Sequence, residues 1–108
     1  MNILIDEAGG AVLVRVNETR IDAAAAAEFK DRLRPHIACD GPDVMMDLSQ
    51  VAFIDSSGLG AVIALRKALP AGRQMRLAGL TPNVARVFRL TRMDSVFEIF
   101  PSVAAARA

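Results

Sequence analysis

The sequence predicts an α/β fold in which short strands alternate with helices around a largely parallel sheet. Short apolar runs recur along the chain, and the segments between them carry apolar residues every three or four positions, as amphipathic helices do. The resulting order of strand, helix, strand, helix, strand and helix implies parallel strands joined by helical crossovers. Because 108 residues can bury a core without disulfides, we expect one domain covering residues 1–108.

The first two strands are expected to form a hairpin. Val12, Val14 and Val16 alternate with other residues, which is typical of a strand. Residues 2–5 (NILI) form a second apolar run before Gly9-Gly10, and this glycine pair indicates a turn. The two runs therefore predict an antiparallel pair.

A helix is expected after this hairpin. Asp22 is a favourable N-cap, alanines favour helix directly after it, and Phe29, Leu33 and Ile37 recur every four residues. Pro35 should end or kink this helix near Leu33, because a residue before proline avoids helical angles.

The central part of the chain predicts a strand and a second helix. Residues 43–48 (DVMMDL) read as a buried strand and residues 51–54 (VAFI) as its extension. A helix should then begin near Ser57, with Ser57 as its cap. The apolar side of this helix comprises Leu59, Val62, Ile63 and Leu69.

The C-terminal part predicts two more strands and two helices. Residues 73–80 read as a strand, and Thr81-Pro82 starts a helix with threonine as the cap and proline at the first helical position. Residues 95–100 should form a last strand and residues 101–108 a short helix. The buried stripe of the helix after Pro82 comprises Val84, Val87 and Phe88.

Charge is unevenly distributed along the chain, although the net charge is only +1. From Met1 to Asp55 there are ten acidic and five basic residues. From Ser56 to Met93 there is no acidic residue, and the basic ones are Arg66, Lys67, Arg73, Arg76, Arg86, Arg89 and Arg92. This asymmetry suits an acidic protein partner or ordinary solvated helix faces. Direct nucleic-acid binding is disfavoured, because the chain has neither tryptophan nor tyrosine for stacking and no recognisable binding motif.

The remaining composition favours a cytoplasmic protein. Cys39 is the only cysteine, so the chain can form no internal disulfide and no cysteine-built metal site. Asp6 and Glu7 lie where a secretory signal would need basic residues, and no apolar run approaches the length of a membrane span. We therefore expect neither secretion nor insertion into a membrane.

Enzyme motifs are incomplete, so we expect a protein that is not an enzyme. The segment GLG follows a strand, but a dinucleotide site would need a third glycine at Ile63 and an acid about twenty residues later. The phosphate-loop signature and the G-x-S-x-G elbow are also missing, and the single histidine, His36, lies beside a helix-breaking proline. Acid–base catalysis by Asp47 and Asp55 remains an alternative, although nothing else marks a cleft.

Three segments, in order, resemble a known family. MDLSQVAFIDSSGLGAVIALRKAL resembles the STAS family, the sulfate transporter and anti-sigma factor antagonist domains, whose hallmark is a strand, then Asp-Ser-Ser-Gly-Leu-Gly, then a helix. RIDAAAAAEFKDRL looks like the turn into the family's first helix, and LAGLTPNVARVFRLTRMDSVFEIFPS like its later strand, helix and final strand. The chain departs from the pattern at Thr19, where many members have glycine, so this loop and its partner choice are expected to differ.

The resemblance implies a fold and a function. The fold would be a four- to five-stranded mixed sheet with helices mainly on one face. The function would be that of a stand-alone anti-sigma factor antagonist, which binds a serine kinase of histidine-kinase-like ATPase type that doubles as an anti-sigma factor. Phosphorylation would break the complex and a serine phosphatase would restore it. The runner-up is a STAS subunit that serves as an adaptor for a lipid ABC-type membrane transporter.

By position, the phosphorylated residue would be Ser56, directly after Asp55. The expected partner-binding residues are Asp22, Asp55, Ser56, Ser57, Gly58 and Leu59. Glycines at 58 and 60 are costly in a helix, so they predict close approach of another backbone. We further expect Gly58→Leu to weaken kinase binding while leaving the fold intact. No cofactor or metal is implied.

Overall fold

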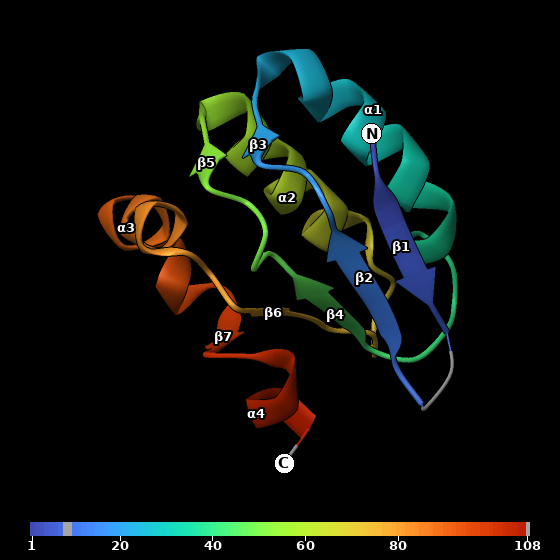
Figure 1. Cartoon of the computed structure of the whole chain (residues 1–108). Coiled ribbons are helices and arrows are strands. Elements are labelled where there is room, and N and C mark those ends of the chain that lie inside the picture. Colours follow the sequence, from blue (N-terminus) through green and yellow to red (C-terminus); the bar gives the residue numbers. More distant parts are fainter. Residues whose placement is uncertain (8–9, 108) are drawn as a thin grey trace.

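The computed structural model describes residues 1–7 and 10–107, and its centre is a five-stranded mixed sheet (Figure 1). The strand order is β1-β2-β4-β6-β7. The first pair is antiparallel and the other neighbours are parallel, as the hairpin and the crossovers predicted. Gly9 of the expected turn lies outside the described residues. The five strands are β1 (Ile3–Asp6), β2 (Val12–Val16), β4 (Val44–Asp47), β6 (Met75–Ala78) and β7 (Glu98–Phe100).

A second, two-stranded sheet lies apart from the first. It consists of β3 (Arg20–Ile21) and β5 (Phe53–Ile54), which pair in parallel with Arg20 opposite Phe53 and Ile21 opposite Ile54. The prediction that residues 51–54 extend the preceding strand is therefore wrong. The chain turns after β4, where the Val51 N–H donates to the Leu48 carbonyl at 3.0 Å, and this turn carries β5 away from the main sheet.

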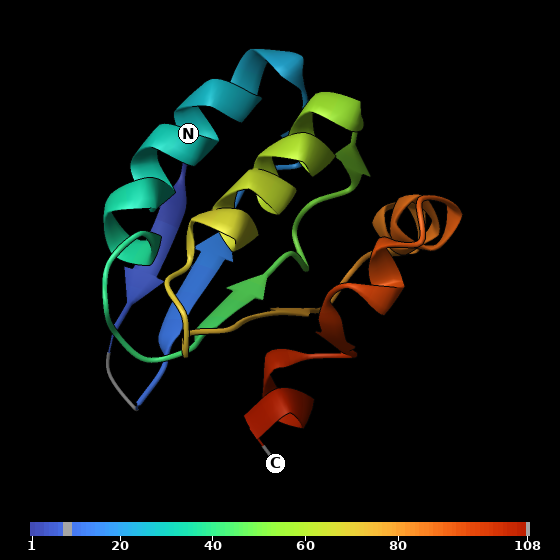
Figure 2. The ribbon, with the colours of Figure 1, turned by 180° about the vertical axis from the view of Figure 1, so that it is seen from behind.

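The long helices α1 (Ala23–Ile37) and α2 (Ser56–Ala68) lie side by side on one face of the main sheet (Figure 2). The main apolar core fills the space between these helices and the sheet. Residues with no exposed surface in this layer include Val14, Phe29, Met46, Val62 and Leu77. This arrangement confirms the predicted mixed sheet with helices mainly on one face.

Helix α1 continues past Pro35 and ends at Ile37, so the predicted end near Leu33 is wrong. Two interactions favour the last turn. Ile37 is fully buried, and the Arg73 guanidinium donates to the carbonyls of Ile37 at 3.1 Å, Cys39 at 2.8 Å and Pro42 at 2.5 Å. A cation at a helix C-terminus also opposes the negative end of the helix dipole.

Helix α3 (Pro82–Leu90) begins at Pro82 with Thr81 in the N-cap position, as predicted. The Thr81 hydroxyl nevertheless makes no capping bond, because it donates to the Val51 carbonyl at 2.6 Å and so ties α3 to the turn before β5. Val84 and Phe88 are buried as expected, whereas Val87 is only partly buried.

The opposite face of the main sheet carries a smaller apolar cluster. Leu13, Met45 and Ala78 are covered there by Phe100 and by the short helix α4 (Val103–Arg107). A one-turn 3-10 helix, η1 (Met93–Ser95), connects α3 to β7. This face therefore has far less helical cover than the face under α1 and α2.

Candidate partner-binding site

Two aspartates cap the two long helices and lie beside each other. Asp22 Oδ1 accepts from the Ala25 N–H at 3.2 Å, at the start of α1. Asp55 Oδ1 accepts from the Gly58 N–H at 2.8 Å, at the start of α2. The other oxygen of Asp55, Oδ2, accepts from the Ala23 N–H at 3.0 Å, so one carboxylate serves both helix starts. Each helix leaves its first N–H groups unpaired, and Asp55 satisfies one in each helix.

The structure corrects the predicted capping by Ser57. Asp55 is the N-cap of α2, Ser56 is the first helical residue, and Ser57 is the second. Both serines are exposed, and neither hydroxyl caps the helix. Capping therefore does not distinguish Ser57 from Ser56, because the cap uses neither hydroxyl.

Gly58 and Leu59 are buried, which separates them from the other expected partner-binding residues. A Cβ placed on Gly58 would lie 2.0 Å from the Ile21 carbonyl oxygen, so α2 packs directly against the backbone of β3. This confirms the close approach for Gly58. At Gly60 a Cβ would meet nothing within 4 Å, so the same prediction is wrong there. The expectation that Gly58→Leu leaves the fold intact is wrong for the same steric reason.

An exposed arginine and an exposed aromatic ring, which lie against each other near Asp22, were missed by the sequence analysis. The Arg20 guanidinium carbon lies 4.3 Å from the centre of the Phe53 ring, and Arg20 Nε donates to Asp22 Oδ2 at 3.5 Å. Phe53 is 39% exposed, although most apolar side chains of this size in the chain are buried. A signal was available, because Arg20 and Phe53 each precede a capping aspartate by two residues. We call the exposed set Arg20, Phe53, Ser56 and Ser57 the serine surface.

The residues considered for catalysis have other partners. Asp47 is buried, where Oδ1 accepts from the Ser49 N–H at 2.9 Å and Oδ2 from Arg15 Nε at 3.2 Å. His36 Nδ1 lies 3.2 Å from a carboxylate oxygen of Glu7, near the C-terminal end of α1. The described residues contain no group of three or more histidine, cysteine, aspartate or glutamate side chains that could hold a metal ion.

Asp43 and Arg76, whose pKa values are both shifted, form an ion pair near the start of β4 and β6. The Gln74 N–H and the Arg76 guanidinium, at 2.9 and 2.8 Å, hold the pKa of Asp43 below its usual 3.8. The same carboxylate raises the pKa of Arg76. This pair supports the strand ends and has no contact with the serine surface among the interactions of the described residues.

Thr19 fits its loop without strain. Its carbonyl accepts from the N–H groups of Ala52 at 2.8 Å and Phe53 at 3.1 Å, and so holds β5 beside β3. Thr19 is not in the left-handed backbone region, so this position does not demand glycine.

The fold and the two capped helix starts define a STAS domain. The family model described as "STAS domain" matches residues 2–106, and the chain belongs to this family. It is 31% identical over 80 residues to the anti-sigma-B factor antagonist of Listeria monocytogenes, covering 73% of this chain and 70% of that one. It is 29% identical over 101 residues to the Bacillus subtilis protein of the same name, covering 92% of both.

Comparison of structures gives the same class. An anti-sigma factor antagonist from Mycobacterium paratuberculosis superposes with a TM-score of 0.87 and 25% identity, over 95% of this chain and 87% of that one. These relatives are named for antagonism of a regulator, in agreement with the expectation that the protein is not an enzyme. Among the described residues, no helix has both the length and the apolar character needed to cross a bilayer.

Proposed function

We propose that this protein is an anti-sigma factor antagonist in a partner-switching cascade. In its unmodified form it binds a serine kinase of histidine-kinase-like ATPase type that also acts as an anti-sigma factor. Phosphorylation of Ser56 releases this regulator, and a serine phosphatase restores binding. The protein works by binding, in the cytoplasm, and catalyses nothing itself.

The observation that carries the proposal is the exposed Ser56 at the first position of a helix whose cap does not need it. Asp55 makes both capping bonds at this point, at 2.8 Å to Gly58 and 3.0 Å to Ala23. A kinase can therefore modify the Ser56 hydroxyl without breaking a bond that holds the fold. Ser57 is exposed as well, and the preference for Ser56 rests on its position directly after the aspartate in the family pattern.

A phosphate at Ser56 would change binding far more than folding. It adds nearly two negative charges at a helix N-terminus, where the helix dipole favours anions. A partner that covers the same surface must remove water from that dianion and approach the neighbouring Asp55 carboxylate. We therefore expect the modified protein to stay folded and to lose its partner.

Arg20 and Phe53 give the serine surface an apolar and a cationic contact point. Phe53 offers an exposed ring, and the Arg20 guanidinium carbon lies over it, 4.3 Å from the ring centre. Aromatic and arginine side chains are the residues most often found to dominate binding energy at protein interfaces. In this proposal Phe53 contacts the regulator while Ser56 lies within the same interface.

The test compares binding of the regulator to three variants by calorimetry, after the regulator has been isolated with the unmodified protein as bait. Ser56→Asp should weaken the complex at least about tenfold, equal to about 1.4 kcal/mol. Ser56→Ala should bind as wild type does and persist in ATP, while wild type dissociates. Ser57→Ala is the matched control and should dissociate in ATP as wild type does.

Three results would contradict the proposal. Phosphate mapped to Ser57 alone would refute the assignment of the site. Equal affinity of wild type, Ser56→Ala and Ser56→Asp would refute a switch operated by charge. Isolation of a transporter ATPase instead of a kinase would favour the adaptor function.

A further inference from the structure

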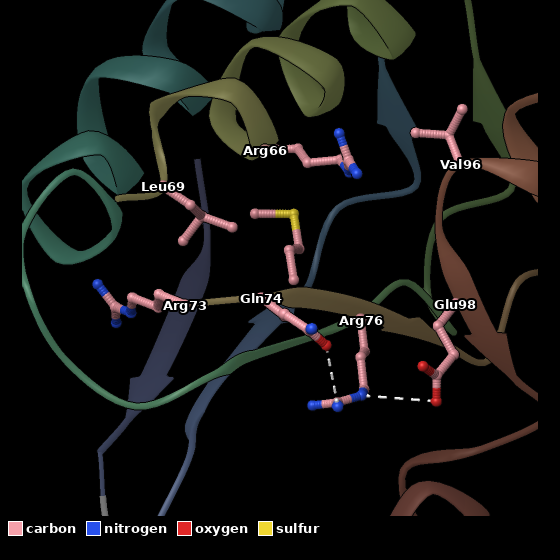
Figure 3. Close-up of a pocket in the computed structure, with 8 residues that line it drawn as sticks. Arg66, Leu69, Arg73, Gln74, Arg76, Val96 and Glu98 are labelled. Carbon is pink, nitrogen blue, oxygen red and sulfur yellow. Dashed lines mark hydrogen bonds and ion pairs between the residues drawn. The ribbon is translucent and has the colours of Figure 1, made fainter. Parts of the chain in front are cut away.

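Most of the basic residues between Ser56 and Met93 remain on the surface, although two are used inside the fold. Arg73 is 6% exposed and donates to the carbonyls at the end of α1. Arg76 lies in a pocket of about 330 Å³ between α2, β6 and β7, where it contacts Gln74 and Glu98 (Figure 3). It also forms an ion pair with Asp43 at 2.8 Å. These two arginines are therefore already neutralised or bonded.

Helix α3 presents a basic outer face. Arg89 and Leu90 follow Arg86 by three and four residues, so both lie beside Arg86 on one side of the helix. All three are exposed, and Leu90 is 74% exposed, the largest value among the large apolar side chains of the described residues. Neither arginine has an ion pair among the described residues, and the exposed Arg92 comes two residues after the end of the helix. We call Arg86, Arg89 and Leu90 the α3 outer face.

An apolar cleft adjoins this face. It has a volume of about 460 Å³ and lies between α3, η1 and β7, with Leu80, Phe88, Ile99 and Phe100 among its lining residues. Arg89 belongs to both the cleft and the outer face. Asp94 also lines the cleft and is its one acidic side chain. A cleft of this size can accept a large apolar side chain, since protein pockets that hold small ligands begin at about 300 Å³.

We propose that the α3 outer face and its cleft form a second docking surface, which binds an acidic segment of the regulator carrying one large apolar side chain. The carboxylates of that segment would contact Arg86, Arg89 and Arg92, and its apolar side chain would enter the cleft. An apolar centre with a polar rim is the usual anatomy of a protein interface. The inference rests on the proposed function, because it names the same regulator as the partner.

Helix α3 lies next to the strand that carries Phe53 of the serine surface. Helix α3 packs against β5, the strand that leads directly to Ser56, and the Thr81 hydroxyl fixes its start to Val51. Helix α4, in contrast, lies well away from α3 in both views of the ribbon (Figures 1 and 2). A charge change on α4 is therefore a suitable control for one on α3.

The test measures association and dissociation rates of the regulator with the whole protein at low and high salt. Arg89→Glu and Arg86→Glu should each lower the association rate at least about threefold at low salt, and salt should reduce the effect. Arg107→Glu on α4 makes the same charge change and should leave the rates unchanged. Ala85→Leu, which narrows the cleft from α3, should speed dissociation at least about threefold without a charge change.

The outcomes separate this inference from the proposed function. If Ser56→Asp weakens the complex while the α3 variants bind as wild type does, the docking surface is refuted and the switch stands. If Arg107→Glu has the same effect as Arg89→Glu, general charge steering replaces the docking surface. If the α3 variants still bind the regulator but lose binding to anionic vesicles or to DNA, an acidic protein segment is the wrong class of partner. If wild type binds no regulator, both proposals fail. An unchanged melting temperature serves as the control that each variant is folded.

Discussion

Adding one methyl group at two glycines of α2 should change stability in opposite directions. Gly58→Ala places a Cβ 2.0 Å from the Ile21 carbonyl oxygen, whereas ordinary contact begins at 3.4 Å. The neighbouring contacts are the Ile21 carbonyl carbon and the Ile54 side chain, both at 2.9 Å, so β3 and β5 must move with the backbone. Overpacking of this kind costs about 3 kcal/mol, and the better helix propensity of alanine returns about 1 kcal/mol. The expected net loss is about 2 kcal/mol.

Gly60→Ala is the matched control, because the added Cβ meets nothing within 4 Å. It should gain up to about 1 kcal/mol from helix propensity alone. Thermal melting followed by circular dichroism should therefore place Gly58→Ala about 8–15 °C below wild type and Gly60→Ala a few degrees above it. Equal melting temperatures for the two variants would refute the claim that α2 packs on the backbone of β3.

Three further variants test the other interactions described above. Arg73→Met should lower the free energy of unfolding in urea by at least about 3 kcal/mol, because three carbonyls lose a charged donor. Arg73→Lys should restore only part of this stability. A loss under about 1 kcal/mol for Arg73→Met would contradict the role of Arg73 at the end of α1. Asp55→Asn should destabilise the fold by about 1 kcal/mol and Asp55→Ala by about 2 kcal/mol, since the amide keeps one acceptor oxygen and alanine keeps none. If both variants melted at the wild-type temperature, the shared cap would be refuted. Because the pKa of Asp43 is depressed, its carboxylate stabilises the fold at neutral pH and loses this effect as the pH falls below 3.8. The difference in unfolding free energy between wild type and Asp43→Asn should therefore shrink between about pH 5 and 2.5. A constant difference would contradict this role of Asp43.

The sequence predicted the four helices and the strands of the main sheet well, because these depend on local pattern, but it predicted neither β3 nor η1. The hairpin follows from alternating valines, and Pro82 marks the start of α3 through its fixed backbone angle. Element boundaries that depend on residues far away in the chain were harder to predict from the sequence. Helix α1 passes Pro35 because Ile37 is buried and Arg73, which is 36 residues further along the chain, bonds its last turn.

The same reasoning explains what was missed at the candidate site. Asp55, Ser56 and Ser57 are all favourable capping residues, so local preference cannot choose among them. The choice depends on the Ala23 N–H, which lies 32 residues away in sequence and gives Asp55 a second bond. The parallel pairing of Arg20 with Phe53 is also a distant contact, and only the matched spacing before the two aspartates could have suggested it.

The shared cap at Asp55 separates the residues needed for folding from the residue proposed for signalling. Asp55 and Gly58 join two helices and a strand, so a descendant protein that had lost its regulator would still need both. Ser56 makes no such contribution, and its replacement would cost the fold little. An intact aspartate and glycine therefore do not diagnose a working switch in a related chain. Loss of the switch during evolution would first become visible as substitution of Ser56.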